Sequence, residues 1–428
     1  MLRRIYSALL YIAAPLALAF TALRGWRDPL YRDRLAERLG YTKLLFDAPP
    51  IWIHAVSVGE VQAAAVLIRA LSKRYPHCPI LVTTATPTGA ARVRALFGEL
   101  VRHAYLPYDL PGAVARFLSR VGPAVAIVME REIWPNLFGE CTRRGIPILL
   151  ASARLSQRSA ERHRRLGALF TPALSENVTI AAQTPADARR FSQIGAIDAR
   201  VRVVGNIKFD FDPPEQARAA GAAFRASQLA ERAVWIAGST HEGEEQIVVD
   251  AHRRVREQHP NALLVLVPRH PNRFDAVRSW LRSQSIPFAS RSVRDPIDRQ
   301  TSVLLVDTLG ELLMLYAAGD VAFVGGSLVP IGGHNLLEPA ALDKPIIVGP
   351  HNFNAEDVAR SFLDAGAAIE VSDADTLASA VLELLEDSDK RAEMTRRARA
   401  ILEENRGALD RLLELLEPML SRRDPPAR

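Results

Sequence analysis

Short apolar segments alternate with helical patterns along almost the whole chain, and this alternation restricts the possible folds more than any other feature. Each apolar segment has the length of a buried strand. Strands connected by helices run parallel, and helices cover both faces of such a sheet. The predicted strands are Ile51–Val56, Ile80–Thr84, Ala124–Met129, Ile148–Leu150, Val178–Ala182 and Val201–Val204, followed by Val234–Ala237, Leu263–Val267, Val303–Val306, Val321–Val324 and Ile346–Val348.

The alternation is interrupted once, between residues 206 and 214, where two aspartates and two prolines stand close together. A chain of 428 residues is also too long for one ordinary core. We therefore expect two doubly wound, Rossmann-like α/β domains with a cleft between them, over residues 25–212 and 213–405. A C-terminal helix and tail would follow over residues 406–428. Ligands of such domains bind at the carboxyl ends of the strands.

The N-terminal segment from Ile5 to Leu23 is almost wholly apolar and carries no charge. Its length is near the minimum for a membrane-spanning helix. Arginines are denser after it than before it, which would place the following domains in the cytoplasm. We expect a membrane anchor over residues 1–24. Two alternatives remain open, an interfacial helix that lies on the bilayer and a cleaved signal peptide ending near Ala17-Leu18-Ala19.

Composition excludes several classes of protein. Lys and Arg number 54 against 48 Asp and Glu, and aromatic residues are not interleaved with the basic ones as in a nucleic-acid binder. We expect no nucleic acid partner, and we assign the basic segments to anionic lipid or a phosphorylated substrate. Cys78 and Cys141 imply no disulfide framework, so a reduced cytoplasmic setting is expected.

Signals for a metal or a cofactor are weak. The chain has no His or Cys cluster with ligand spacing, no Walker A pattern, and no GxGxxG after a first strand. Asp210-Phe211-Asp212 and Asp373-Ala374-Asp375 have Asp-x-Asp spacing, but their positions are typical of linker or capping acids. We therefore expect neither a bound metal nor a cofactor.

The stretch from Val321 to Pro350 has the pattern of strand, glycine-rich loop, helix and strand. Gly325-Gly326 and Gly332-Gly333 would let the backbone approach a ligand closely. The helix start near Leu336 would offer free N–H groups and the positive end of a dipole. Asn335 and Glu338 could also simply cap that helix. Two glycine pairs exceed what a cap needs, so this stretch predicts a nucleotide phosphate site.

Acidic residues follow two strands of the first domain. Glu60 lies at a strand-to-helix turn, where it could serve as a general base, although Ser57 and Glu60 also have the spacing of a capping box. Glu130 and Glu132 follow another strand, and one of them could orient a base or a substrate hydroxyl. An ion pair with a basic side chain is the alternative for these two acids.

Three further segments could bind an anion. Lys208 lies at the domain boundary, where it could reach a departing phosphate or remain a solvated lysine. The segment Ser239–Glu245 follows the first strand of the second domain. Arg269 stands between two prolines at the end of the next strand, in a geometry favourable for bidentate phosphate binding. The loop around Leu309–Glu311 could line a base pocket.

Taken together, these motifs resemble one family, the 3-deoxy-D-manno-octulosonic acid (Kdo) transferases of Gram-negative bacteria. They occur in order through nearly the whole chain. The motifs are HAVSVGE at His54–Glu60, TTATPTG at Thr83–Gly89, YLPYDLP at Tyr105–Pro111, MEREIWPN at Met129–Asn136, GNIKFD at Gly205–Asp210, STHEGEE at Ser239–Glu245, VPRHPNRF at Val267–Phe274 and FVGGSLVPIGGHNLLEPA at Phe323–Ala340.

The resemblance implies a GT-B glycosyltransferase fold with an N-terminal acceptor domain and a C-terminal donor domain. It also implies transfer of Kdo from CMP-Kdo to lipid IVA, the lipid A precursor, in lipopolysaccharide synthesis. The reaction would invert the anomeric carbon without a metal, on the cytoplasmic face of the inner membrane and beside its phospholipid. No obligate protein partner is expected.

The resemblance also assigns roles to residues. Glu60 would be the general base, and Glu130 and Lys208 would stabilise the transition state. The implied CMP contacts are Pro268, Arg269, Leu309, Gly310, Glu311, Asn335, Leu336, Leu337 and Glu338.

One position departs from the family pattern, because Arg131 replaces a small hydroxyl residue. Arg131 could pair with Glu130 or contact an acceptor phosphate. Two other functions also fit the sequence: a GT-B enzyme that uses a UDP-sugar, and a membrane-anchored lipid-binding protein without catalysis. Preference for UDP over CMP would favour the first, and lipid binding without turnover would favour the second.

Overall fold

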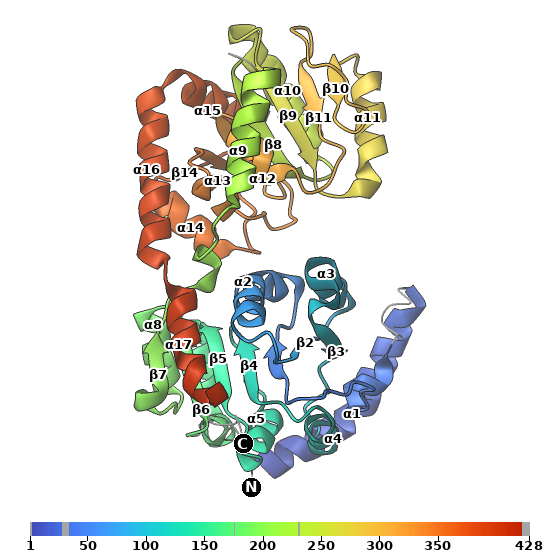
Figure 1. The fold of residues 1–428 in the computed structure, drawn as a ribbon, viewed down its shortest axis with the longest axis vertical. Coiled ribbons are helices and arrows are strands. Elements are labelled where there is room, and N and C mark those ends of the chain that lie inside the picture. The colour runs from blue at the N-terminus through green and yellow to red at the C-terminus, as the bar shows by residue number, and fades with distance from the viewer. Residues whose placement is uncertain (1, 28–33, 175, 230–231, 422–428) are drawn as a thin grey trace. The chain divides into compact units, whose positions relative to one another are not determined.

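The computed structural model describes residues 2–27, 34–174, 176–229 and 232–421. The chain forms two compact units (Figure 1). The first unit consists of Met1–Asp210 together with Asn405–Arg428, and the second of Phe211–Glu404. In the described part of the chain, each unit contains one seven-stranded parallel sheet.

The first sheet has the strand order β3-β2-β1-β4-β5-β6-β7, so the chain proceeds from β1 to one side and later continues from β4 on the other. The interior strands are wholly buried, as their continuous apolar runs predict. The strands are β1 (Ile51–His54), β2 (Ile80–Thr84), β3 (Arg102–Tyr105), β4 (Val125–Met129), β5 (Ile148–Ala153), β6 (Val178–Ala182) and β7 (Val201–Val203).

Helices cover both faces of the first sheet. One core packs the sheet against α2, α3 and α17, and the other packs it against α4, α5, α6 and α8. The helices of this unit are α1 (Leu2–Arg27), α2 (Val58–Arg74), α3 (Pro87–Phe97), α4 (Pro111–Val121), α5 (Pro135–Arg143), α6 (Gln157–Arg165), α7 (Gly167–Phe170), α8 (Pro185–Gln193) and α17 (Ala408–Ser421).

The second sheet has the order β10-β11-β9-β8-β12-β13-β14. Its change of direction falls between β8 and β12, the first and fifth strands of this unit along the chain. The strands are β8 (Val234–Thr240), β9 (Leu263–Pro268), β10 (Phe288–Ser290), β11 (Val303–Leu305), β12 (Val321–Val324), β13 (Ile346–Val348) and β14 (Ala368–Glu370).

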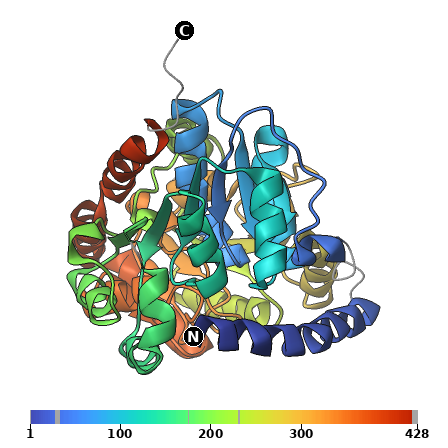
Figure 2. The ribbon, with the colours of Figure 1, turned by 90° about the horizontal axis from the view of Figure 1, so that it is seen from below.

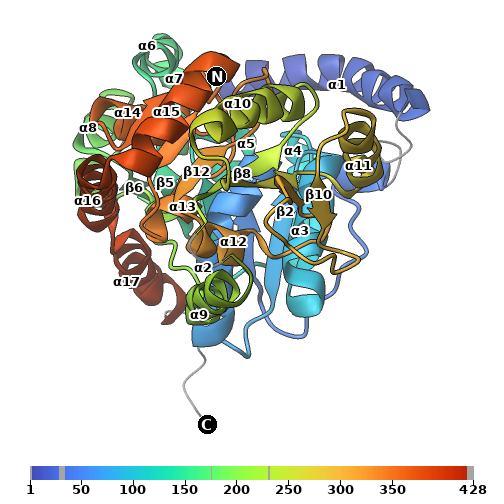
Figure 3. The same ribbon diagram turned by 90° about the horizontal axis from the view of Figure 1, so that it is seen from above.

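Helices also lie on both faces of the second sheet, as Figure 3 shows. Helices α9 and α12 pack on one face, and α10, α11, α15 and α16 contribute to the core on the other. The helices are α9 (Glu215–Phe224), α10 (Glu244–Gln258), α11 (Phe274–Ser283), α12 (Leu312–Ala318), α13 (Leu337–Ala341), α14 (Glu356–Asp364), α15 (Ala374–Glu386) and α16 (Ser388–Asn405).

These two parallel sheets confirm the predicted fold class. The sequence analysis missed three strands, β3, β10 and β14, and all three lie at sheet edges. Edge strands are short and partly exposed, so they lack the continuous apolar run by which buried strands are recognised.

The last helix, α17, belongs to the core of the first unit. Ala408, Leu412 and Leu416 are fully buried there. The Asp210 carboxylate accepts hydrogen bonds from the backbone N–H groups of Gly407 at 2.7 Å and Leu409 at 2.6 Å. The chain therefore leaves the first unit after Asp210 and returns to it at the end.

Helix α1 lies along the outside of the first unit (Figure 2). Arg3 Nε donates to Asn136 Oδ1 at 3.0 Å, and the Tyr6 hydroxyl donates to Asp109 Oδ2 at 3.0 Å. Among the described residues, no helix combines the length and the apolarity that a crossing of the bilayer requires. The structure thus does not support the spanning anchor expected over residues 1–24.

Candidate active site

Glu60 and Glu130 lie at the switch point of the first sheet, where the strand order reverses between β1 and β4. Glu60 is in the first turn of α2, which follows β1, and Glu130 directly follows β4. Ligands of doubly wound sheets bind outside the carboxyl ends of the strands at such a point. Both acids therefore lie at the carboxyl end of a strand, where the sequence predicted them.

The Glu60 carboxylate is held by the backbone. Its Oε2 accepts a hydrogen bond from the N–H of Val56 at 2.7 Å, and Ser57 makes no side-chain cap to the helix. Burial raises the pKa of Glu60 to about 8, and the charges of Glu130 and Glu132 add to this rise. A carboxyl group with such a pKa can accept a proton near neutral pH, as a general base must.

Glu130 forms the centre of an ion-pair network. Lys208 Nζ lies 3.1 Å from its Oε1, and Arg154 Nε lies 3.0 Å from its Oε2. Burial would raise the pKa of Glu130, but Lys208 and Arg154 together lower it below the ordinary value. Its backbone φ is +58°, a left-handed conformation that is uncommon outside glycine and that often marks functional sites.

The sequence analysis predicted Lys208 but not Arg154 as a partner in this site. Nothing in the local sequence links Arg154 to Glu130. Arg154 follows β5, the neighbour of β4, so adjacency of strand ends was the available signal. The Arg131 side chain is exposed, and Glu130 forms its ion pairs with Lys208 and Arg154.

In the second unit, the predicted nucleotide contacts follow neighbouring strands. Pro268 and Arg269 lie at the end of β9, the segment Leu309–Glu311 follows β11, and Asn335–Glu338 follow β12. Their strands are close together in the order β11-β9-β8-β12. The fold therefore brings the three segments to the same edge of the sheet.

The individual contacts of these segments differ. Glu311 pairs with Arg291 at 2.7 Å, while the Leu309 side chain is exposed. Asn335 Oδ1 accepts from the N–H of Leu337 at 3.1 Å, and its Nδ2 donates to Glu338 Oε1 at 3.2 Å. Asn335 thus bonds to the first residue of α13 and to Glu338, but the N-cap position of this helix is Leu336, and no side chain caps it there.

Several N–H groups of the glycine loop are engaged within the protein. Its N–H groups at Gly326, Ser327 and Leu328 donate to the buried carboxylate of Glu244, at 2.7, 3.0 and 2.9 Å. Gly332 and Gly333 donate to the carbonyl of Gly326. These five N–H groups are therefore occupied by protein acceptors and hold the shape of the loop.

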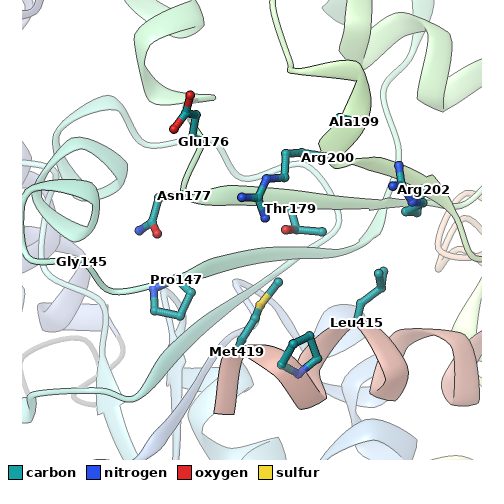
Figure 4. A pocket seen from close by; sticks show the side chains of 11 residues that line it. Gly145, Pro147, Glu176, Asn177, Thr179, Ala199, Arg200, Arg202, Leu415 and Met419 are labelled. Atoms are coloured by element: carbon teal, nitrogen blue, oxygen red, sulfur yellow. The ribbon is translucent and has the colours of Figure 1, made fainter. Parts of the chain in front are cut away.

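Two described pockets lie away from these residues. One, of about 410 Å³, is lined by Arg200, Arg202, Leu415 and Met419 among others, between the β6–β7 edge and α17 (Figure 4). The other, of about 770 Å³, lies beside Arg34 and the start of β3. In the described ranges, no group of three or more His, Cys, Asp or Glu residues is placed to hold a metal ion.

Comparison with known proteins covers almost the entire chain. The profile of the family "3-Deoxy-D-manno-octulosonic-acid transferase (kdotransferase)" matches residues 33–211, and that of "Glycosyl transferases group 1" matches residues 299–401. A 3-deoxy-D-manno-octulosonic acid transferase of Haemophilus influenzae is 44% identical over 425 residues, which span 99% of this chain and 100% of that protein.

Solved structures show the same fold at low sequence identity. A putative UDP-N-acetylglucosamine 2-epimerase from Listeria monocytogenes is 14% identical, with a TM-score of 0.54 over 89% of this chain and 99% of that chain. A glycosyltransferase from Rickettsia africae is 13% identical, with a TM-score of 0.53 over 88% and 99%. The two Rossmann-like units therefore resemble those of GT-B glycosyltransferases.

Proposed function

The chain belongs to the 3-deoxy-D-manno-octulosonic-acid transferases, and on this premise we propose that it transfers Kdo from CMP-Kdo to a hydroxyl of lipid IVA. The transfer would serve lipopolysaccharide core synthesis. The observation that carries the proposal is the pair of acids at the first switch point. Glu60 has a raised pKa there, whereas Glu130 is held ionised by Lys208 and Arg154.

The two acids have separate tasks in this proposal. Glu60 takes the proton of the acceptor hydroxyl while the hydroxyl oxygen attacks the anomeric carbon of Kdo. The bond from that carbon to the phosphate oxygen breaks, and CMP leaves with its electron pair. Attack opposite the leaving group inverts the anomeric carbon. CMP is a stable anion, so the departing group needs no protonation and the mechanism needs no metal.

Glu130, Lys208 and Arg154 form a fixed charged group beside the base. Lys208 and Arg154 contact opposite oxygens of the same carboxylate, so Glu130 fixes the position of both cations. We assign Glu130 to holding both cations in place and Lys208 to stabilising negative charge in the transition state. In the second unit, Pro268, Arg269, Leu309–Glu311 and Asn335–Glu338 are assigned to the cytidine nucleotide.

A transfer assay tests the proposed function directly. The purified protein is given CMP-Kdo and lipid IVA with and without EDTA, and the lipid products are analysed by mass spectrometry. We expect a gain of one or more Kdo masses in both conditions. Activity with a UDP-sugar and none with CMP-Kdo would contradict the donor, and loss of activity with EDTA would contradict the metal-independent mechanism.

Helix α1 supports a place at the inner membrane as an interfacial helix. Its polar contacts hold one side against the first unit, and large apolar side chains on the other side are exposed. The first five of these recur every three or four residues and the sixth follows seven residues later, so they form a stripe along the helix. We infer that this stripe enters the cytoplasmic leaflet. The stripe consists of Leu2, Ile5, Leu9, Ile12, Leu16 and Leu23.

Replacing Leu9 and Ile12 together with serine is expected to weaken binding to anionic phospholipid vesicles by at least about ten-fold. Each side chain contributes about 1.5–3 kcal/mol when it is fully buried in an apolar phase. Vesicle flotation measures the bound fraction. The matched control replaces Leu100 and Val293, which are similarly exposed outside α1, with serine. Equal binding of both variants would contradict the role of the stripe.

A further inference from the structure

Three histidines gather at the switch point of the second sheet. His241 follows β8, His270 follows β9, and His334 lies in the loop after β12. The Nε2 atoms of His241 and His334 are 2.8 Å apart, and their rings stack at 5.1 Å with 10° between the planes. The His270 ring meets that of His241 edge-on at 5.2 Å. Three loops that are distant in sequence thus build one cluster.

The backbone fixes the His241–His334 pair from one side. Gly326 has a φ of +71°, and a Cβ built there would lie 2.9 Å from Cδ2 and 3.0 Å from Nε2 of His334. Any side chain at this position would therefore displace the imidazole. The Glu244 carboxylate that holds this loop also accepts the N–H of His241 at 2.9 Å. One buried carboxylate thus positions both loops that carry the pair.

The surrounding charges favour an anion. Arg273 is paired with Glu242 at 3.0 Å and Glu245 at 3.1 Å, and Glu244 is occupied by the loop amides. Within the ranges that the structure describes, the Arg269 guanidinium has no carboxylate partner. The nearby carboxylates are therefore engaged elsewhere, and the cluster keeps an excess of cationic or potentially cationic groups.

These charges also keep the pair neutral. Burial lowers the pKa of His241 to about 4, helped by His270, Arg269 and Arg273. Burial lowers the pKa of His334 to about 3, helped by His241, Arg269 and His270. Both imidazoles are thus uncharged at neutral pH, and an approaching anion would raise both pKa values by offsetting the positive charges.

A neutral pair and a protonated pair differ in what they can bind. With 2.8 Å between the Nε2 atoms, one N–H donates and the other nitrogen accepts, so the two atoms satisfy each other. Protonation of the acceptor places an N–H on both facing atoms. The two groups then repel, the hydrogen bond breaks, and each imidazole can donate to an external oxygen.

We propose that His241 and His334 form a proton-linked phosphate subsite for the cytidine nucleotide. In the empty site the two imidazoles share one hydrogen bond. When the phosphate of CMP arrives beside Arg269, the pair takes up a proton from solvent, and both Nε2–H groups donate to phosphate oxygens. The proposal rests on the proposed function, because that function supplies the nucleotide.

The test is a proton count by isothermal titration calorimetry of CMP into the full-length protein. Titrations at pH 7.5 in two buffers with different ionisation enthalpies give the number of protons taken up. The second phosphate pKa is about 6, so CMP is already mainly dianionic and the protons bind to the protein. We expect uptake of up to about one proton per CMP, and none for cytidine, which lacks the phosphate.

Variants locate the proton. His241→Gln combined with His334→Gln should abolish the uptake and weaken CMP binding by about ten-fold or more, the effect of losing one charge-assisted hydrogen bond. Each single variant should also lose the uptake, because either change removes the pair. His77→Gln, an exposed histidine of the other unit, is the control and should change neither quantity. Circular dichroism verifies that each variant is folded.

The outcomes separate this inference from the proposed function. CMP binding by the unmodified protein without proton uptake would overturn the subsite and leave the transferase proposal intact. Uptake that persists in the double variant would place the proton elsewhere and also overturn it. If the folded protein does not bind CMP, both proposals fail, and the transfer assay would then be negative as well.

Discussion

Replacing Glu60 with glutamine is expected to reduce Kdo transfer by about 10²- to 10⁴-fold, the usual contribution of a general base. The amide keeps the size of the side chain and an oxygen that can accept the N–H of Val56, so the start of α2 should be preserved. It has no basic site for the proton of the acceptor hydroxyl. Transfer rates under single-turnover conditions measure the loss, and calorimetry should show unchanged CMP binding.

The matched control is Glu99→Gln, a highly exposed glutamate in the same unit. It should retain full activity. Activity of the unmodified protein should also rise as the pH rises through about 8, because the base acts in its deprotonated form and its pKa is raised to about 8. Near-normal turnover of the Glu60 variant would remove Glu60 as the base, whatever the form of the pH profile.

Replacing Glu130 with glutamine is expected to reduce transfer by about 10²-fold or more, because Lys208 and Arg154 lose the carboxylate that positions them. The folded state should lose about 1–3 kcal/mol. This is less than for a fully buried ion pair, because water partly screens side chains that are 24% and 34% exposed. Chemical denaturation measures the stability, and the transfer assay measures the rate.

Two readouts separate a positioning role of Glu130 from a general loss of stability. The charge of Glu130 contributes to the raised pKa of Glu60, so the pH profile of the residual activity should shift to lower pH. A double-mutant cycle with Lys208→Met should be non-additive, because the single changes disrupt the same interaction. Additive effects together with an unshifted profile would contradict the role assigned to Glu130.

The sequence predicted the interior of both sheets well, because buried parallel strands are continuous apolar runs. It also placed Glu60 and Glu130 correctly at strand ends, since that depends only on where a strand stops. It did not predict β3, β10 and β14, whose residues are partly exposed. A local apolar pattern thus identifies the central strands of a sheet more reliably than the partly exposed strands at its edges.

The errors in the candidate sites have a different cause. The sequence did not show that the N–H groups of Gly326, Ser327 and Leu328 donate to Glu244, because this glutamate is distant in sequence. Arg154 was not recognised as a partner of Glu130 because the two residues follow different strands and meet only in the folded protein. Which charged group meets which is decided by tertiary packing, and residue spacing carries little information about it.

The spanning anchor expected from the composition of the apolar N-terminal segment is not supported by the structure. The segment has almost the length of a span, but Arg3 and Tyr6 are engaged by Asn136 and Asp109 on the surface of the first unit. When the polar side chains on one side of a helix contact protein, only the opposite side is exposed. That side then forms an apolar stripe, and the helix surface is not apolar all round. The periodicity of the exposed apolar side chains, more than total apolarity, is the feature that supports the interfacial helix proposed above.

The return of α17 to the first unit has a consequence for synthesis on the ribosome. The second unit is contiguous in the chain and precedes α17, so all its strands are synthesised before this helix. The first unit lacks Ala408, Leu412 and Leu416 of its core until α17 has been synthesised. In the nascent chain, one face of the first sheet therefore stays incompletely covered until the whole second unit has been made.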